Sequence, residues 1–390
     1  MFYGPGLAHH KLAMTLIGLQ HMALVALFYV VAFISSLGLR ANAAPPANDH
    51  FTNAISLTGI ISVSATNVGA TAELGEPAHA DEPAARSIWW KWSPTLAATY
   101  SIVTTNNLAT NGLKLDTTLA VYTGNSVSKL TRVVANDDTD FGEFGATWSR
   151  AVFRAYPGET LFIAVDGIDA SGSFRLNINL AGPIAQPWQA TNLFGEPLLS
   201  STFIGQVVMV DFWETICGAC VEELPDLIRV QNALRPRGFT FVGLSGDHDP
   251  VVVRDYVGDS SINYPIAMKN SVVETILAGG PVGYPTKILL DPEGRIVGRY
   301  LGGHPEAYYR SLIEPLLRPS PPVRLSVVRA PGGVRLSWPG WQSGYRIETS
   351  SDLSGRLWFS NDIRPTISNS QYNLTLSNSQ AAQFFRLAKP

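Results

Sequence analysis

The chain has 390 residues, which at about 150 residues per domain indicates two to three domains. Charged residues make up only 15% and the formal net charge is -3, which excludes a strongly basic nucleic-acid surface. Two cysteines are too few for a disulfide-stapled scaffold, or for a zinc or iron–sulfur site with four cysteine ligands.

The N-terminal segment is almost wholly apolar from Leu12 to Leu39 and is followed by Arg40. The small-residue sequence Ala41-Asn42-Ala43 comes next and is typical of a cleavage site. We therefore predict an export signal over residues 1–43. An uncleaved membrane anchor is the alternative, because a stretch of this length could span a bilayer. Either way, residues 45–390 are predicted to be exported, as a periplasmic, cell-surface or secreted protein that contacts a membrane only through an uncleaved N-terminal segment.

Residues 45–182 are predicted to be all-β, because short alternating runs are separated by Gly, Asn, Asp and Pro. The predicted strands are Ser87–Trp92, Tyr100–Thr104, Thr118–Tyr122, Ala151–Ala155, Thr160–Val165 and Ser173–Asn179. Their number and spacing favour a sandwich, with Trp89, Trp90 and Trp92 divided between a core face and an exposed face. The segments Ser87–Trp92, Asp116–Gly124, Asn136–Asp138 and Phe162–Gly167 resemble the β-sandwich of pre-peptidase C-terminal domains, which implies an accessory module.

Residues 184–318 alternate between strand and helix patterns, which is typical of an α/β domain. The predicted strands are Gln206–Trp213, Phe239–Ser245, Thr286–Asp291 and Arg295–Leu301, the last two forming a hairpin. The predicted helices are Ala219–Leu234, Val251–Val257, Ser271–Leu277 and Pro305–Leu317.

Residues 320–390 are again predicted to be β, after a linker stiffened by Pro319, Pro321 and Pro322. The alternating runs are Val334–Trp338, Tyr345–Thr349 and Phe384–Leu387. The segments Gly333–Trp338 and Phe384–Leu387 resemble fibronectin-III-like C-terminal modules, which implies a small sandwich.

Both cysteines lie in one motif, Cys217-Gly218-Ala219-Cys220, which follows a predicted strand and opens a predicted helix. Unpaired N–H groups and the positive dipole end of a helix stabilise a thiolate at the first cysteine. A thiolate is the attacking species in disulfide exchange, and the two-residue spacer lets Cys220 reach Cys217. The alternatives are an inert disulfide, which would remove little chain entropy over so short a loop, and half of a metal site without a second ligand pair.

The segment Val210–Cys220 looks like the active-site segment of the thioredoxin superfamily. The downstream sequence Val221–Pro225 and the entry Ala190–Val208 are similar to its exported TlpA/ResA-like branch, and Val282–Ile296 matches the family's cis-proline strand and hairpin. The resemblance covers about 135 residues, with the motifs in the right order. It implies a thioredoxin-like fold for the central α/β domain. Together with the predicted β regions on either side, the fold class is multidomain, with this domain between two all-β sandwich domains.

The resemblance also implies roles for single residues. Cys217 is the exposed nucleophile, Cys220 the buried resolving thiol, and Pro285 the cis-proline beside the sulfurs. The backbone of Tyr284 could pair with a substrate strand. No cofactor is implied beyond the redox-active disulfide Cys217–Cys220.

Two carboxylates are candidates for taking the proton of Cys220. Asp211 matches the buried acid of thioredoxins and Glu223 the acidic residue of the TlpA/ResA branch, and burial should raise the pKa of such a group. The alternatives are that Glu223 lies on a solvated helix face and that Asp211 is paired elsewhere.

Three further positions concern substrate binding. Ile216 stands where the family usually has tryptophan, and Ala219 stands where it usually has proline, which leaves partner choice and redox potential open. Trp213 keeps the family's residue and is a candidate substrate contact, with core packing as the alternative.

A cluster of oxygen-bearing side chains in the first region could supply ligands for calcium, although its spacing does not fit an EF-hand loop. The candidates are Asn136, Asp137, Asp138 and Asp140, with Asp116 or Asp166. Turn formation by Asn and Asp explains these residues equally well.

The sequence thus predicts an extracytoplasmic thiol-disulfide oxidoreductase. Its partners would be protein thiol or disulfide substrates and an upstream thiol electron donor. No nucleic-acid partner is predicted. The alternative is an adhesion or carbohydrate-binding protein in which the thioredoxin-like domain is a redox-passive spacer. A peroxidase on the same fold is disfavoured, because Thr215 lies two rather than three positions before Cys217 and the required proline is missing.

Overall fold

The computed structural model describes residues 43–138, 147–340, 344–352, 357–361, 363–368, 371–377 and 383–389. The predicted export signal falls on residues 1–43 and so lies almost entirely outside this part. Within the described residues, no helix has both the length and the apolar character needed to cross a membrane.

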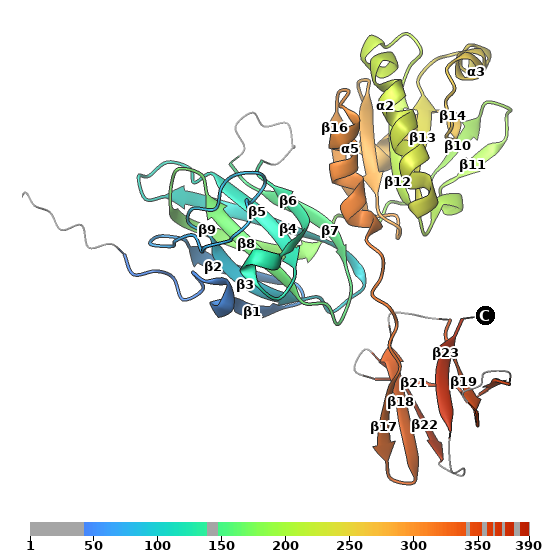
Figure 1. The fold of residues 1–390 in the computed structure, drawn as a ribbon. Helices are drawn as coiled ribbons and strands as arrows, with labels where there is room; N and C mark the ends of the chain where they lie inside the picture. Colours follow the sequence, from blue (N-terminus) through green and yellow to red (C-terminus); the bar gives the residue numbers. More distant parts are fainter. Residues whose placement is uncertain are drawn as a thin grey trace, which may run out of the picture. The chain divides into compact units, whose positions relative to one another are not determined.

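The strands between residues 55 and 180 form two sheets, drawn in blue to green in Figure 1. The first has the order β1 (Ile55–Thr58), β3 (Ile88–Ser93), β8 (Leu161–Gly167), β5 (Thr117–Thr123) and β6 (Thr131–Asn136). The second has the order β2 (Ile61–Thr66), β9 (Gly172–Leu180), β4 (Ala98–Ala109) and β7 (Arg150–Ala155). All six predicted strands are confirmed, whereas β1, β2 and β6 were not predicted.

Successive side chains of the first sheet point to opposite faces, and those on each face join a different hydrophobic cluster. Leu119 and Val121 of β5 join a cluster that draws residues from both sheets. Ala120 and Tyr122 point to the opposite face and join a second cluster with Phe51. The three tryptophans of β3 are all buried, so the predicted exposed tryptophan face is wrong: Trp90 and Trp92 lie in the first cluster and Trp89 in the second.

The central part contains a seven-stranded sheet. Its order is β11 (Pro197–Leu199), β10 (Gln189–Asn192), β14 (Ile266–Met268), β13 (Phe239–Ser245), β12 (Val207–Trp213), β15 (Thr286–Leu290) and β16 (Ile296–Leu301). Strand β12 runs parallel to β13 and antiparallel to β15, and β15 and β16 form the predicted hairpin. The short strands β10, β11 and β14 were not predicted.

Helices cover both faces of this sheet. They are α2 (Gly218–Leu234), α3 (Pro250–Asp259), α4 (Ser271–Ala278) and α5 (Glu306–Ile313), with a 3-10 turn over Glu314–Leu317 continuing α5. Met209 and Trp213 of β12 pack with residues of α2, α3 and α5, whereas Val210 and Phe212 pack with residues of α4. The side chain of Asp211 therefore projects from the face that α2 and α5 cover.

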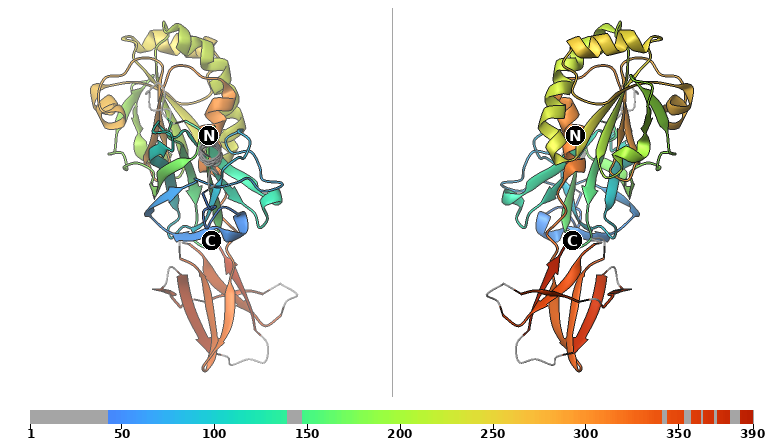
Figure 2. Two further views of the ribbon diagram at one scale, coloured as in Figure 1. Left: turned by 90° about the vertical axis from the view of Figure 1, so that its left-hand side faces the viewer. Right: turned by 90° about the vertical axis from the view of Figure 1, so that its right-hand side faces the viewer.

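The C-terminal part contains two further sheets, drawn in orange to red in Figures 1 and 2. One has the order β17 (Ser326–Ala330), β18 (Gly333–Pro339), β22 (Gln371–Ser377) and β21 (Thr366–Ser368). The other has the order β20 (Phe359–Ser360), β19 (Arg346–Ser350) and β23 (Phe384–Ala388). Leu336, Trp338, Ile347 and Leu374 form their shared core.

Candidate active site

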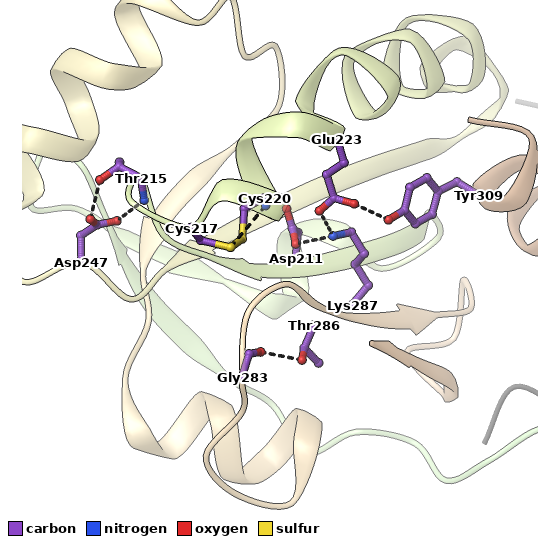
Figure 3. The surroundings of a disulfide bond; sticks show 10 residues. All are labelled: Asp211, Thr215, Cys217, Cys220, Glu223, Asp247, Gly283, Thr286, Lys287 and Tyr309. Carbon is purple, nitrogen blue, oxygen red and sulfur yellow. Dashed lines mark hydrogen bonds and ion pairs between the residues drawn. A yellow bond between two sulfur atoms is a disulfide. The ribbon is translucent and has the colours of Figure 1, made fainter. Parts of the chain in front are cut away.

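The two cysteines lie where β12 leads into α2, and their sulfur atoms are joined in a disulfide (Figure 3). Cys217 is the N-cap of α2, and its sulfur accepts a hydrogen bond from the backbone N–H of Cys220 at 3.2 Å. Cys217 is partly exposed, whereas Cys220 is 2% exposed. One sulfur therefore faces approaching molecules and the other lies beneath it, and the N–H groups of the first helical turn point toward the exposed sulfur.

The loop that carries Cys217 is held in place by Asp247, which lies just after the neighbouring strand β13. Thr215 donates to the Asp247 carboxylate twice, from its backbone N–H at 3.0 Å and from its hydroxyl at 2.6 Å. Ser245 donates a further hydrogen bond to Asp247 at 2.7 Å. Burial raises the pKa of Asp247, but these hydrogen bonds outweigh burial and hold the pKa below its ordinary value.

The second wall of the site is the loop before β15. The peptide bond between Tyr284 and Pro285 is cis, as the resemblance implied, and Thr286 donates to the carbonyl of Gly283 at 2.7 Å. A Cβ added at Gly246, just after β13, would lie 2.1 Å from the Tyr284 hydroxyl, so a larger residue there would displace the Tyr284 ring. A Cβ at Gly283 would meet nothing within 4 Å, which leaves this side of the loop open to a partner chain.

A buried polar cluster lies beneath α2 (Figure 3). Asp211 and Lys287 are directly opposite each other on β12 and β15, and the Lys287 ammonium lies 3.0 Å from Asp211 Oδ1. The same ammonium donates a hydrogen bond to Glu223 Oε1. The hydroxyl of Tyr309 on α5 donates to Glu223 Oε2 at 2.5 Å. Four elements of the fold, β12, β15, α2 and α5, thus bring these four side chains together.

The charges of this cluster do not cancel. Burial raises the pKa of Glu223; the Lys287 ammonium lowers it in part, and the Asp211 carboxylate raises it again. Burial also raises the pKa of Tyr309, with Glu223 as the next cause, so the phenol remains a neutral donor. One ammonium faces two carboxylates, and the cluster becomes neutral when Glu223 gains a proton. A group of this kind is suited to accept a proton from a thiol nearby.

The predicted site residues differ in how far they are buried and in their partners. Glu223 is 4% exposed, so the alternative of a solvated helix face is wrong, and Asp211, 1% exposed, is paired with Lys287. Ile216 is 86% exposed next to Cys217. Trp213 is 1% exposed within the core, so its prediction as a substrate contact is wrong and core packing describes its place.

Lys287 and Tyr309 were not identified as site residues from the sequence. A lysine within the otherwise apolar run Lys287–Leu290 was an available signal, because a charged residue inside a buried strand needs a buried partner. The partner could not be found from sequence spacing, since Asp211 and Lys287 meet only when β12 pairs with β15.

Comparisons with known proteins point to the same part of the chain. Residues 188–313 match the family described as Redoxin. Thiol-disulfide oxidoreductase ResA of Bacillus thuringiensis subsp. konkukian is 26% identical over 121 residues, which cover 31% of this chain and 69% of that protein. ResA of Halalkalibacterium halodurans is 26% identical over 139 residues, which cover 36% of this chain and 78% of that protein.

Solved structures are similar over about a third of the chain. A thiol:disulfide interchange protein of the thioredoxin family from Chlorobium tepidum is 27% identical, with a TM-score of 0.34, and covers 36% of this chain and 99% of that one. A thiol:disulfide interchange protein from Bacteroides sp. is 29% identical, with a TM-score of 0.31, and covers 34% of this chain and 88% of that one.

Proteins of this type use no cofactor, because their redox-active cysteines do the chemistry themselves. Since the Redoxin match spans the disulfide, the cis-proline loop and the buried cluster, the central part of this chain is a thioredoxin-like domain with thiol-disulfide oxidoreductase activity.

Proposed function

We propose that this protein exchanges disulfides with protein substrates outside the cytoplasm, through the motif Cys217-Gly218-Ala219-Cys220. The observation that carries the proposal is the pairing of a partly exposed sulfur at a helix N-terminus with a buried sulfur above a proton-accepting cluster. The flanking all-β parts would act as accessory sandwich modules, and the apolar N-terminal segment would direct export.

In the proposed cycle the Cys217 thiolate attacks one sulfur of a substrate disulfide. A mixed disulfide forms, and the other substrate sulfur leaves as a thiolate. Cys220 then transfers its proton to Glu223 and attacks the Cys217 sulfur. The Cys217–Cys220 disulfide forms and the second substrate thiolate is released. The substrate gains two electrons, which an upstream thiol donor restores to the protein, and every step is reversible.

The position of Glu223 supports its part in this cycle. Glu223 follows Cys220 by three residues on α2, so the two side chains lie on the same face of the helix. Lys287 holds the carboxylate from below and Tyr309 holds its other oxygen. Both contacts fix the orientation of the acceptor, and the excess negative charge favours uptake of the thiol proton.

The substrate would lie against the open loop before Pro285. The exposed side of Gly283 leaves room for an extended chain beside the Tyr284 backbone, and Ile216 offers an apolar contact next to the reactive sulfur. An extended peptide can pair with such a loop through main-chain hydrogen bonds, which recognise many sequences.

Two cysteine variants test the proposal against a redox-passive domain. We expect Cys217→Ser to abolish reduction of a disulfide-containing peptide, because the attacking sulfur is gone. Cys220→Ser should accumulate a mixed disulfide through Cys217 that mass spectrometry detects. Turnover retained in Cys217→Ser would overturn the proposal, as would a Cys217 thiol in the reduced protein that titrates at or above the free value of about 8.5.

A further inference from the structure

The N-terminal β part contains a group of acidic side chains that the redox chemistry does not use. Asp116, Asp137 and Asp138 each place a carboxylate oxygen within 4.8 Å of the others. Asp116 immediately precedes β5, and the other two follow the end of β6. Exposed acidic clusters occur often without a ligand, so proximity alone assigns no site.

A buried hydroxyl on the same face of the sheet supplies an independent observation. Thr118 is 1% exposed, and its hydroxyl has no hydrogen-bond partner in the described part of the chain. The β5–β6 register ends with Leu119 opposite Asn136, so Asp137, the first residue after β6, leaves the sheet beside Thr118. Strand alternation places Asp116 on the same face as Thr118. The unpartnered hydroxyl therefore projects from the face that carries the carboxylates.

Two carboxylate oxygens at this site also lack partners. Asp116 Oδ1 and Asp137 Oδ1 are shielded from solvent and accept no hydrogen bond from the described residues. Within 43–138 and 147–340 and the shorter described segments, no lysine, arginine or histidine forms an ion pair with any of the three carboxylates. Buried oxygens that are neither hydrogen-bonded nor charge-paired are costly, so native proteins usually give them a partner.

The three carboxylates lie close enough to repel one another. A bound dication would remove this repulsion.

Two of the other predicted ligands, Asp166 and Asn136, have hydrogen-bond partners of their own. The Asp166 carboxylate accepts backbone hydrogen bonds from Ala85, Arg86 and Gly167. The Asn136 side-chain oxygen accepts one from the Arg150 N–H at 2.8 Å. Asp140 lies outside the described residues.

We propose that Asp116, Asp137, Asp138 and Thr118 form a calcium-binding site in the N-terminal β part. All four side chains offer oxygen and none offers nitrogen or sulfur, which suits a hard cation. Calcium tolerates irregular coordination by six to eight oxygens, whereas magnesium needs near-ideal octahedral geometry. The bound ion ties the start of β5 to the chain that leaves β6, and so stabilises this end of the sheet.

Calcium titration of the full chain, stripped with a chelator, tests the site. We expect calorimetry to show one calcium ion per chain and the unfolding temperature to rise with calcium concentration, because an ion that binds only the folded state stabilises it. The affinity should fall in the range of extracellular calcium modules, with a dissociation constant of about 0.1 to 1 mM.

Two variants and a control locate the site. Asp138→Asn changes an exposed side chain, so the fold is retained, and the loss of one charged ligand should weaken calcium binding by at least about tenfold. Thr118→Val removes only the unpartnered hydroxyl and should also weaken binding. Asp169→Asn alters an exposed acid of the same β part and should bind calcium as the wild type does.

Three results would overturn the proposal: no calcium binding at about 10 mM, well above that affinity range; equal binding by Asp138→Asn and the wild type; or magnesium binding as tight as calcium binding. None of them bears on disulfide exchange, which depends on other residues.

Discussion

Replacing Glu223 by glutamine isolates its part in proton transfer. The amide oxygen can still accept the hydrogen bond from Lys287, and the amide N–H can donate to the Tyr309 hydroxyl, so the geometry at the base of α2 is largely kept. The amide cannot take the proton of Cys220. We expect attack by Cys217 on a substrate disulfide to proceed at the wild-type rate, and the resolution of the mixed disulfide by Cys220 to slow.

The size of the effect follows from the second carboxylate. A positioned general base contributes about 100- to 10,000-fold to a rate. Asp211 remains in Glu223→Gln, on the other side of Lys287 and 3.0 Å from its ammonium, and offers an alternative acceptor. The single variant should therefore resolve the mixed disulfide about 100-fold more slowly. The double variant with Asp211→Asn should approach the upper limit of about 10,000-fold.

Single-turnover kinetics separate the two steps. Reduced protein is mixed with a peptide disulfide, quenched with acid and analysed by mass spectrometry for the mixed disulfide. In the wild type the resolution rate should rise with pH as Glu223 ionises, above the ordinary value of about 4.3 because burial raises its pKa. Glu222→Gln, which changes the exposed neighbour on the same helix, is the control and should behave as the wild type does.

Resolution of the mixed disulfide by Glu223→Gln at the wild-type rate, with an unchanged pH profile, would contradict the role of Glu223 as the base. Slowing of both steps by the same factor would contradict it too, since that would indicate a general disturbance of the site rather than the loss of a base.

Three further predictions concern stability, measured by urea denaturation of the oxidised protein. Lys287→Met leaves a buried carboxylate pair without its ammonium and should lower the free energy of unfolding by about 3 kcal/mol at pH of about 8, but by less near pH 5, where more of Glu223 is protonated; equal losses at both values would contradict this. Because the folded pKa of Glu223 is raised, its contribution to stability is present below about pH 4.3 and is lost as the pH rises through that raised pKa, so Glu223→Gln should gain stability relative to the wild type between pH of about 5 and 8. Thr215→Val loses the 2.6 Å hydrogen bond to Asp247 and should cost about 1 kcal/mol at neutral pH. That cost should shrink as the pH falls from about 3.9 through the lowered pKa of Asp247, because the ionised carboxylate accepts the hydrogen bond. A cost that does not change with pH would contradict this role of the ionised carboxylate.

Local patterns predicted the positions of the cysteines well. A strand of mostly apolar residues, a Cys-x-x-Cys spacing and a helix-spaced run are all short-range signals, and they place Cys217 at the N-cap of α2. The hairpin of β15 and β16 was predicted for the same reason, because its turn residues lie between two adjacent runs.

Long-range packing was predicted less well. The exposure of Glu223 stayed open in the sequence because it depends on α5, which supplies Tyr309 from 86 residues away. The three-residue strand β14 carries too short a pattern to be seen, although it pairs with both β13 and β10. Trp213 resembled a family contact residue, but strand alternation turns its ring into the core, where it packs against Tyr256.

The N-cap of α2 influences the reduction potential of the Cys217–Cys220 disulfide. In the oxidised protein the Cys217 sulfur accepts the Cys220 N–H as a neutral disulfide sulfur. After two-electron reduction the same atom is an anion, and an anion accepts hydrogen bonds more strongly. Any stabilisation of that anion by the first turn of the helix favours the reduced form. It raises the reduction potential by about 30 mV for each 1.4 kcal/mol. Ala219 adds an N–H that a proline would lack, so this one position helps to decide whether the protein donates electrons to its partners or withdraws them.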